Sequence, residues 1–444
     1  MIGAFDGRTP LLRLRSGLSK AGIGSEGNGV RVNKLIRVML GLVDTVVVGA
    51  WVDGGVLVVE VRPKAYAEGR CGVCEQRCAG YDRGVGVRRW RAPDLGHLRV
   101  FLVGSVPRVR CPQHRVVLAR VPWARHGARH TRDFEDTTAW LARHTSKSTV
   151  ARLMRVSWRT VGSIVTRVLA ELDTKAGDRL AGVRRIGIDE ISYKRGHKYL
   201  VVVVDHDTGR LLWLSPERTK KSLGGFFDRL GEDRCAQLEL VSADGADWIA
   251  DMVGLRAPQA RQCMDPFHVV MWGMKALDDT RRQVAAAARR EGNADLAKVL
   301  GPRCRFALWK NPGDLTTRQR ATLAEIERIN GPLFRAYLLK EQLRAVFAPG
   351  GAERGVYLDQ WLRWARTSGL PAFVDLAYRM EPYVDEIKNA LRYRLSNARV
   401  ESINTKIRLL TRIAFGFKSV SALIAIAMLH LGGYDLRLPG RAPT

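Results

Sequence analysis

Alternation of apolar and polar residues begins in the stretch DTVVVGAWVDGGVLVVEVRP, residues 44–63. A period of two places successive side chains on opposite faces of a strand, so the stretch predicts β-structure. Two more β-rich runs follow in VRRWRAPDLGHLRVFLVGSVPRVRCPQH, residues 87–114. These runs predict a small β module over residues 35–125. Residues 1–34, rich in Gly, Arg and Ser, are expected to be a disordered tail or the product of a misassigned start codon.

The hydrophobic period becomes helical between His130 and Leu172. Three short amphipathic runs, each of the last two preceded by a Ser suited to capping a helix, predict three helices within residues 126–176. The stretch RRIGIDEISYKRGHKYLVVVVDHDTGRLLWL then predicts three strands, with hairpin turns near Arg195–Gly196 and Asp207–Gly209. A helix in KKSLGGFFDRLG and a fourth strand in AQLELVSADGA follow. From Trp272 onward nearly the whole chain reads as helical.

The net charge of the chain restricts the class of binding partner. The 444 residues contain 73 Lys+Arg against 44 Asp+Glu, a formal charge of +29, and 46% of them are hydrophobic. A chain of this length predicts more than one domain with real cores, and this charge favours a nucleic acid over a membrane surface. An Arg-rich genome is the alternative explanation of the Arg content. No apolar run reaches the roughly 18 residues of a membrane span, and the N-terminal stretch has no apolar signal region, so a cytoplasmic, nucleoid-associated protein is expected.

Two short Cys/His pairs predict a structural zinc site. The four candidate ligands are Cys71, Cys74, Cys111 and His114. Two such knuckles joined by β-structure can hold four N/S donors tetrahedrally, which is the geometry of structural Zn²⁺. Unrelated cysteines are the alternative reading, and Cys78 or the His126/His130 pair could replace one ligand. The remaining cysteines, Cys235, Cys263 and Cys304, are expected in hydrophobic cores.

The stretch STVARLMRVSWRTVGSIV fits a helix-turn-helix. The positions where its two helices would touch are Ala151, Val156, Val161 and Ile164. The positions that would face a DNA major groove or its phosphates are Ser157, Trp158, Arg159, Thr160 and Arg167. Arg155 departs from the pattern, because a Gly is usual at that turn. An ordinary helical hairpin is the alternative.

Carboxylates end two of the predicted strands. Asp189 ends the first strand and Asp244 ends the fourth. In a sheet of order 3-2-1-4 these strands are neighbours, and two adjacent carboxylates are costly unless a cation lies between them. Two Mg²⁺ ions held there could support phosphoryl transfer, provided that a third carboxylate closes the site. The alternative is an ordinary turn Asp at each strand end.

Glu401 is the candidate for that third carboxylate. It lies in SNARVESINTKIRLLTRIAFGFKS, where one helix face is apolar. The opposite polar stripe holds Asn397, Glu401, Asn404 and Arg408. The alternative is a solvated helix face on which Glu401 is an ordinary surface charge.

Taken together, these motifs resemble the DDE transposases of bacterial insertion sequences, and most closely the family written ISL-three, from about Leu40 to Leu431. The segments that carry the resemblance are RRIGIDEISYKRGHKYLVVVVD, VSADGADWIADMV, DPFHVV and NARVESINTKIRLLTRIAFGF. The resemblance implies a multidomain α+β protein with a small zinc-binding β module, a helix-turn-helix and an RNase H-like α/β core interrupted by a large helical insertion. Its core would occupy residues 177–274 and 386–435, with the insertion at 275–385 and a tail at 436–444.

The resemblance also implies residue roles. Asp189, Asp244 and Glu401 would be the catalytic, Mg²⁺-binding carboxylates, and Cys71, Cys74, Cys111 and His114 the zinc ligands. The supporting active-site positions would be Asn397, Asn404, Lys406, Asp265 and His268.

The resulting hypothesis is a transposase that binds the terminal inverted repeats of its element and cuts and joins DNA with two Mg²⁺ or Mn²⁺ ions. Its partners would be double-stranded DNA, both transposon ends and target, and at least one further copy of itself, because two ends must be brought together. Arg side chains of the insertion would contact phosphates, and Trp309, Trp361 and Trp364 would either stack on an unpaired base or pack between helices. The alternatives are a regulator or inactive derivative that binds the repeats without catalysis, and a simple nuclease on the same core.

Overall fold

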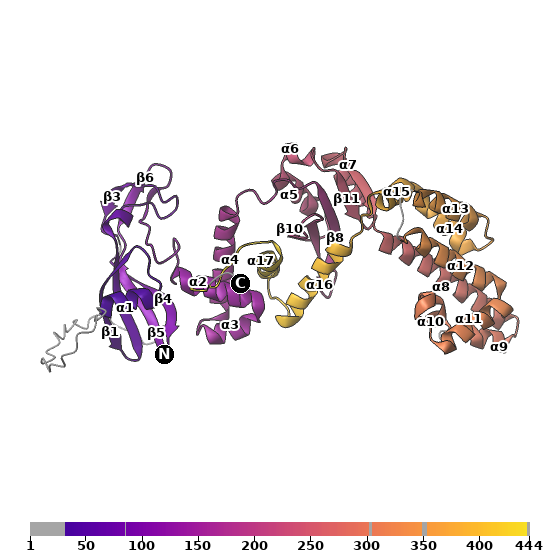
Figure 1. Cartoon of the computed structure of the whole chain (residues 1–444), viewed down its shortest axis with the longest axis horizontal. Helices are drawn as coiled ribbons and strands as arrows, with labels where there is room; N and C mark the ends of the chain where they lie inside the picture. Colours follow the sequence, from indigo (N-terminus) through magenta and orange to yellow (C-terminus); the bar gives the residue numbers. More distant parts are fainter. Residues whose placement is uncertain (1–31, 85, 302–303, 349–352, 442–444) are drawn as a thin grey trace, which may run out of the picture. The chain divides into compact units, whose positions relative to one another are not determined.

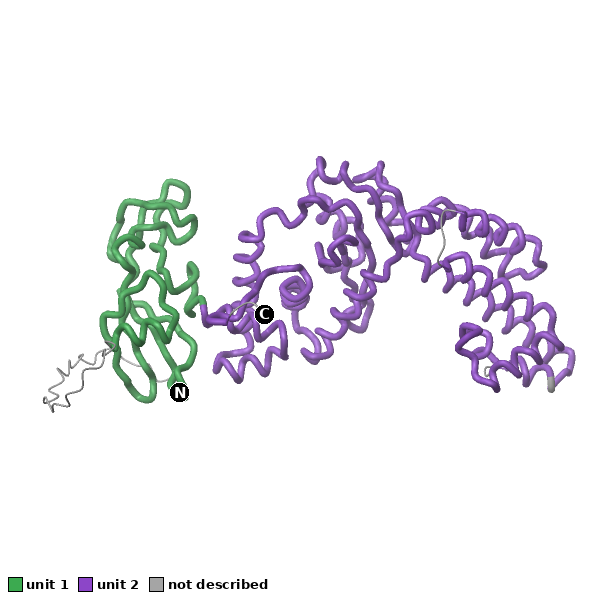
Figure 2. The backbone as a smooth tube through the Cα atoms, viewed as in Figure 1, with its two compact units in different colours: residues 1–132 green, residues 133–444 purple. Residues whose placement is uncertain are grey.

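A computed structural model describes residues 32–84, 86–301, 304–348 and 353–441 (Figure 1). Most of the expected N-terminal tail and the last three residues of the expected C-terminal tail lie outside these ranges; Val32–Lys34 begin a helix. The chain divides into two compact units, Met1–Arg132 and Asp133–Thr444 (Figure 2). No helix among the described residues is long and apolar enough to cross a membrane.

The first unit is a β module. Its elements are α1 (Val32–Met39), β1 (Thr45–Asp53), β2 (Val56–Pro63), η1 (Ala65–Ala67), β3 (Ala79–Asp82), β4 (Val87–Leu95), β5 (Leu98–Ser105), β6 (Arg108–Cys111) and β7 (Arg115–Leu118). Four strands form a sheet of order β1-β2-β5-β4, and three form a second sheet of order β3-β6-β7. Alternate residues of β2 and β5 are buried, so one face of the larger sheet builds the core around Val59, Val100 and Leu102.

The second unit begins with three helices and a mixed sheet. The helices are α2 (Arg132–His144), α3 (Lys147–Leu153) and α4 (Trp158–Lys175). The sheet contains β8 (Arg185–Lys194), β9 (Lys198–Asp205), β10 (Leu211–Pro216), β11 (Leu240–Ala243) and β12 (Arg261–Met264), with α5 (Lys220–Leu230), α6 (Glu232–Cys235) and α7 (Asp247–Arg256) between strands. Its order is β10-β9-β8-β11-β12, so the predicted neighbourhood of the first and fourth strands is confirmed. The fifth strand, β12, was not predicted.

Helices cover both faces of this sheet. Strand β9 shows why: in its VVVV run Val201 and Val203 enter the core beneath α5 and α7, whereas Val202 and Val204 enter the opposite core. That second core also holds Val161 and Ile164 of α4 and residues of α16 (Ala398–Ile413) and α17 (Val420–Leu431). The predicted helix-turn-helix segment therefore shares one hydrophobic core with the sheet.

A long helical segment separates β12 from α16. It comprises α8 (Pro266–Arg290), α9 (Ala294–Val299), α10 (Arg305–Trp309), η2 (Pro312–Asp314), α11 (Thr317–Ile329), α12 (Gly331–Val346), α13 (Arg354–Arg366), α14 (Pro371–Met380), η3 (Glu381–Tyr383) and α15 (Val384–Tyr393). These helices enclose a hydrophobic core of their own. Trp361 lies inside it with 1% exposure and donates from Nε1 to the Leu339 carbonyl at 2.8 Å, so this Trp packs between helices. Trp364 packs against the same core, whereas Trp309 is 36% exposed.

Candidate active site and zinc centre

The four predicted zinc ligands lie together in the first unit. Cys111 ends β6, His114 precedes β7, and Cys71 and Cys74 come from the loop before β3. Their donor atoms all lie within 4.8 Å of one another. Cys74 Sγ is 3.7 Å from Cys111 Sγ, and His114 Nδ1 is 3.5 Å from Cys111 Sγ and 3.7 Å from Cys71 Sγ. A tetrahedral zinc with ordinary bond lengths requires about 3.8 Å between two sulfurs and about 3.6 Å between sulfur and nitrogen.

This geometry fits a closed structural zinc site. Cys78, His126 and His130 lie outside the four-atom group. Burial raises the pKa of the Cys111 thiol, but hydrogen bonds from His114 and Gln113 outweigh burial and lower that pKa to about 6. A thiolate is the form that binds zinc, so the local structure favours the ligand state. Cys235, Cys263 and Cys304 are buried in hydrophobic cores, as expected.

Asp189 and Asp244 are neighbours in the second unit, but only Asp244 lies at a strand end. The prediction that Asp189 ends the first strand was wrong, because β8 continues to Lys194 by pairing with β9 beyond the end of β11. Strands β8 and β11 pair in parallel, with Ser242 opposite Gly187. Two residues further along this register, Asp244, directly after β11, comes opposite Asp189 in the middle of β8. Asp189 Oδ1 accepts from the Glu190 amide at 2.7 Å, and Asp244 Oδ1 accepts from the Ala246 amide at 3.2 Å. Each carboxylate is thus oriented by the backbone that follows it.

Burial and like charge act together on Asp189. Burial raises its pKa most, the nearby carboxylates Asp244 and Asp265 add to the effect, and the resulting pKa is about 6. The Glu190 amide and the charge of His268 oppose the shift. An acid that is costly to ionise is expected where a bound cation neutralises its charge.

Alternation along β8 determines which helix faces Asp189. Gly187, Asp189 and Ile191 share the face that packs against α16, whereas Ile188 belongs to the core on the other face. Gly187 permits this packing, because a Cβ there would lie 2.3 Å from Val400 Cγ2 of α16. Helix α16 therefore approaches β8 closely on the face that carries Asp189.

Asn404 connects α16 directly to the carboxylates. It is 2% exposed, and its Nδ2 donates to Asp189 Oδ2 at 2.8 Å. Glu401 lies one helical turn earlier, so its side chain emerges beside Asn404 on the same face. Glu401 itself is exposed, as are Lys406 and Arg408. The polar stripe therefore does not simply face solvent, because Asn397 and Asn404 are buried, whereas Glu401 is exposed beside them.

Asn397 anchors the start of the same helix. It is 1% exposed; its backbone amide donates to Asp265 Oδ1 at 3.1 Å, and its Nδ2 donates to the Ile188 carbonyl at 3.4 Å. Its Oδ1 accepts from the Ser242 hydroxyl, which in turn lies 2.7 Å from His206 Nε2. Burial lowers the pKa of His206 to about 4, so the ring is neutral and can donate to Ser242. This buried network ties α16 to β8, β11 and the end of β12.

The DPFH segment contributes an acid–imidazole pair. Asp265 is 2% exposed and lies between α16 and His268, whose Nδ1 donates to Asp265 Oδ2 at 3.0 Å. This hydrogen bond raises the pKa of His268, burial opposes it, and the charges of Asp244 and Asp189 support it. The structure thus brings Asp189, Asp244, Asp265, His268, Asn397 and Asn404 into one electrostatic neighbourhood.

Sequence reasoning missed Glu190 and its partners. On the face opposite Asp189, Glu190 accepts from Trp248 Nε1 at 3.0 Å and pairs with Arg218 Nε at 2.8 Å. Burial raises the pKa of Glu190, Arg218 opposes this, and Asp244 adds to it. Because Trp248 lies in the first turn of α7, the contact fixes the turn that carries Asp244 against β8. The one signal in the sequence was that Glu190 adjoins Asp189.

The predicted helix-turn-helix forms from α3 and α4. Val161 and Ile164 are buried between the helices, and Ala151 and Val156 pack against the same core, as expected. Arg155 occupies the turn with φ +55°, the left-handed conformation for which Gly is usual.

The five predicted DNA-facing side chains differ in their surroundings. The Ser157 hydroxyl accepts from the Thr160 amide at 3.1 Å and caps α4, and Arg159 is exposed in the first turn of that helix. Trp158 is half-buried, with Lys147 Nζ 3.9 Å from its ring centre. Arg167 is paired with the fully buried carboxylate of Glu135.

A Cys/His cluster suited to zinc, a helix-turn-helix, and a mixed sheet with Asp189 within its first strand and Asp244 at the end of its fourth together point to the class of DNA transposases. Comparison with known families agrees. Residues 186–427 match a transposase family model, residues 119–169 match the helix-turn-helix domain of transposase family ISL3, and residues 67–114 match the zinc-finger of transposase IS204/IS1001/IS1096/IS1165. The chain belongs to transposase family ISL3.

Relatives span nearly the same length. The transposase for insertion sequence element IS1557, from two strains of Mycobacterium tuberculosis, is 52% identical over 407 residues, covering 88% of this chain and 91% of the relative. The transposase for insertion sequence element IS1001 of Bordetella parapertussis is 27% identical over 358 residues, covering 78% of this chain and 85% of the relative.

Proposed function

We propose that this transposase binds the terminal inverted repeats of its own element and catalyses strand cleavage and strand transfer at one site formed by Asp189, Asp244 and Glu401. The observation that carries the proposal is the hydrogen bond from Asn404 to Asp189. It joins the helix of Glu401 to the strand that carries Asp189 beside Asp244, which would let Glu401 act as the third carboxylate.

The donor set suits hard divalent cations. Three carboxylates would hold two Mg²⁺ ions, with Mn²⁺ as a substitute, because oxygen ligands are those that these ions prefer. When bound, the ions supply activation of an attacking oxygen and stabilisation of a leaving oxygen in phosphoryl transfer. Asn404 orients Asp189, and Asn397 and Asp265 fix the start of α16. The hydrogen bond from His268 to Asp265 raises the pKa of His268, which favours positive charge near Asp244. Lys406, exposed on α16, is suited to contact a DNA phosphate.

The same site serves two steps. Water is the nucleophile that cuts the strand at the transposon end, and the freed 3′-hydroxyl is the nucleophile that attacks target DNA. Both steps are in-line displacements at a phosphodiester, so both need the same carboxylates.

The helix-turn-helix supports recognition of the repeats. Arg159 and the exposed start of α4 are suited to the major groove, with Ser157, Trp158 and Thr160 around them. Arg167, paired with Glu135, is better suited to holding α4 in place than to reading bases, and its contribution to DNA binding is expected to be indirect. At least two copies would act together, because two ends must be synapsed. The reaction would take place at the nucleoid in the cytoplasm.

The test uses purified full-length protein, Mg²⁺ and duplexes that carry the inverted repeats flanking the gene. We expect nicking at the repeat ends and joining of the ends to a second duplex. Glu401→Gln should bind the repeats and lose both reactions. Glu327→Gln, an exposed carboxylate on α11, is the matched control and should retain both.

The alternatives give different results. Repeat binding by the unaltered protein without any Mg²⁺-dependent nicking indicates a regulator or an inactive derivative. Nicking without joining indicates a simple nuclease. Cleavage and joining that persist unchanged in Glu401→Gln refute the assignment of this residue.

A further inference from the structure

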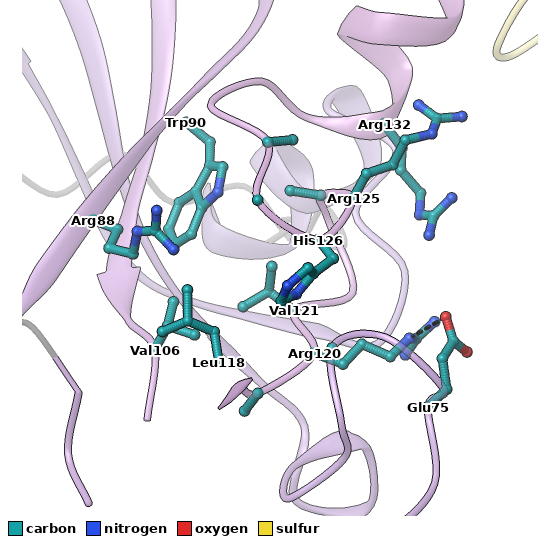
Figure 3. Close-up of a pocket in the computed structure, with 15 residues that line it drawn as sticks. Glu75, Arg88, Trp90, Val106, Leu118, Arg120, Val121, Arg125, His126 and Arg132 are labelled. Atoms are coloured by element: carbon teal, nitrogen blue, oxygen red, sulfur yellow. Dashed lines mark ion pairs between the residues drawn. The ribbon is translucent and has the colours of Figure 1, made fainter. Parts of the chain in front are cut away.

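The first unit contains a basic pocket beside its zinc centre. One wall is formed by Arg88 and Trp90 of β4, and the other by the segment of residues 118–132 (Figure 3). Gly72, within the first zinc knuckle, also lines it. A Cβ on Gly72 would lie 2.4 Å from His126 Nδ1, so the imidazole packs directly on the knuckle backbone.

Backbone pairing builds this pocket from an irregular segment. The Arg91 amide donates to the Arg129 carbonyl, and the Thr131 amide donates to the Arg91 carbonyl, both at 2.9 Å. The Ala128 amide closes a turn on the Arg125 carbonyl at 3.0 Å, and Gly127 adopts φ +70° within it. The segment is therefore held against β4 by hydrogen bonds rather than by its own helix or strand.

Positive charge dominates the lining. Its charged residues are Arg88, Arg120, Arg125, Arg132 and Glu75. Arg120 Nε lies 3.0 Å from Glu75 Oε1, so the one carboxylate of the lining is already paired with the Arg120 guanidinium. Arg88 is half-buried and has no ion pair with any carboxylate of the described residues. A guanidinium removed from water in this way favours an anionic partner that can accept several hydrogen bonds.

The free volume of the pocket limits the size of the anionic group that can bind in it. The pocket offers about 30 Å³. A single water needs about 10–15 Å³, so there is room for about two water-sized groups. That space suits the two non-bridging oxygens of one phosphate and is too small for a nucleobase. Apolar residues complete the lining, and the Trp90 side chain, only 2% exposed, gives the pocket a fixed shape.

We infer that this pocket binds one backbone phosphate of the DNA duplex, with Arg88 as the principal ligand. The inference rests on the proposed function and assigns to the first unit a sequence-independent contact that is separate from base reading by the helix-turn-helix. Phosphate contacts fix the register of a protein on a duplex, and each adds a defined salt dependence to binding.

The test compares full-length Arg88→Gln with the unaltered protein on repeat-bearing and unrelated duplexes. The loss of one phosphate contact should reduce the slope of log affinity against log salt by about 0.9. The advantage of the unaltered protein over Arg88→Gln should therefore shrink by about 3.5-fold between 50 and 200 mM salt, equally on both duplexes. In a series of duplexes with single neutral methylphosphonates, one position should weaken the unaltered protein and leave Arg88→Gln unaffected.

Arg89→Gln is the matched control. Arg89 is the next residue of β4, points to the other face and stacks on Phe101 with its guanidinium carbon 3.6 Å from the ring centre. It should keep the salt slope and the methylphosphonate profile of the unaltered protein. Equal zinc content and equal melting temperature of Arg88→Gln and the unaltered protein exclude loss of folding as the cause.

Three results would overturn the inference. The first is an unchanged salt slope and methylphosphonate profile in Arg88→Gln. The second is the same change in Arg89→Gln. The third is stabilisation of the unaltered protein, but not Arg88→Gln, by inorganic phosphate together with identical DNA binding, because the ligand would then be a free ion. Failure of end cleavage with a normal Arg88 effect refutes the proposed function alone.

Discussion

Replacement of Asp189 by Asn should stabilise the metal-free protein at neutral pH while abolishing DNA cleavage. In the native structure the Asp189 carboxylate is largely buried and faces the charges of Asp244 and Asp265, which raises its pKa from 3.8 to about 6. The folded state therefore disfavours the ionised form. Asn removes the charge and keeps the size of the side chain.

The hydrogen bonds around Asp189 can survive this change. Asp189 accepts from the Glu190 amide through Oδ1 and from Asn404 through Oδ2. Asn404 Oδ1 is buried without a hydrogen-bond partner. If the Asn404 amide turns over, its oxygen accepts from the new amide at position 189, whose own oxygen still accepts from Glu190. The electrostatic gain is therefore not cancelled by a lost hydrogen bond.

The rise of this pKa from 3.8 to about 6 corresponds to about 3 kcal/mol, which is an upper bound on the gain in stability. Its pH dependence has a definite sign. Because the folded-state pKa of this acid is raised, the unfavourable contribution is absent below about pH 4, grows as pH rises toward about 6 and is constant above that. The variant should therefore match the unaltered protein at pH 4 and exceed it at pH 7.

Thermal unfolding in the presence of a chelator measures this difference between pH 4 and pH 7. Asp251→Asn is the control, because Asp251 is a 61% exposed carboxylate outside the site whose surface ion pair with Lys220 contributes little, so its replacement should give only a small change. Adding Mg²⁺ should stabilise the unaltered protein and not Asp189→Asn. A variant that is no more stable at pH 7, or a gain that is equal at both pH values, would refute the account of Asp189.

Three further predictions concern packing and metal. Gly187→Ala should destabilise the second unit by about 1–3 kcal/mol because its Cβ meets Val400, and Val400→Ala in the same chain should restore part of the loss in thermal melts. Cys111→Ser should lose bound zinc and lower the melting temperature of the first unit, whereas Cys235→Ser should keep its zinc by metal analysis. Trp361→Ala should cost about 3–5 kcal/mol in denaturant unfolding, and exposed Trp309→Ala well under half of that.

Local patterns predicted much of the fold. The hairpin of β8 and β9, the parallel neighbour β11 and the two touching helices of the helix-turn-helix all follow from periodicity and turn residues. Strand β12 did not, because four residues, Arg261–Met264, are too few to show alternation. The zinc cluster could be predicted from the sequence because each pair of ligands is local in sequence and both pairs offer zinc-binding side chains.

The surroundings of the carboxylates were only partly predictable. Helical periodicity placed Asn397, Glu401 and Asn404 on one stripe, but periodicity cannot distinguish a polar stripe that faces water from one that faces other polar groups. Only the tertiary structure does so: Asn404 meets Asp189 across 215 positions, and Asn397 meets Ser242 across 155 positions. The role of Glu190 was hidden for the same reason, since its partner Trp248 comes from another element.

The long interval before α16 is compatible with a well-defined site because the interval is itself a folded body. Helices α8 to α15 enclose their own core, so the segment between β12 and α16 is folded and is not a flexible loop. Even for a flexible loop, each doubling of its length would raise the entropic cost of closure by only about 0.6 kcal/mol. The docking of α16 then depends on short buried contacts, chiefly those of Asn397 and Val400. Since Glu401 lies on this helix, the proposed carboxylate site depends on the packing of α16. A change that loosens α16, even far from Glu401, should therefore weaken catalysis before it weakens DNA binding.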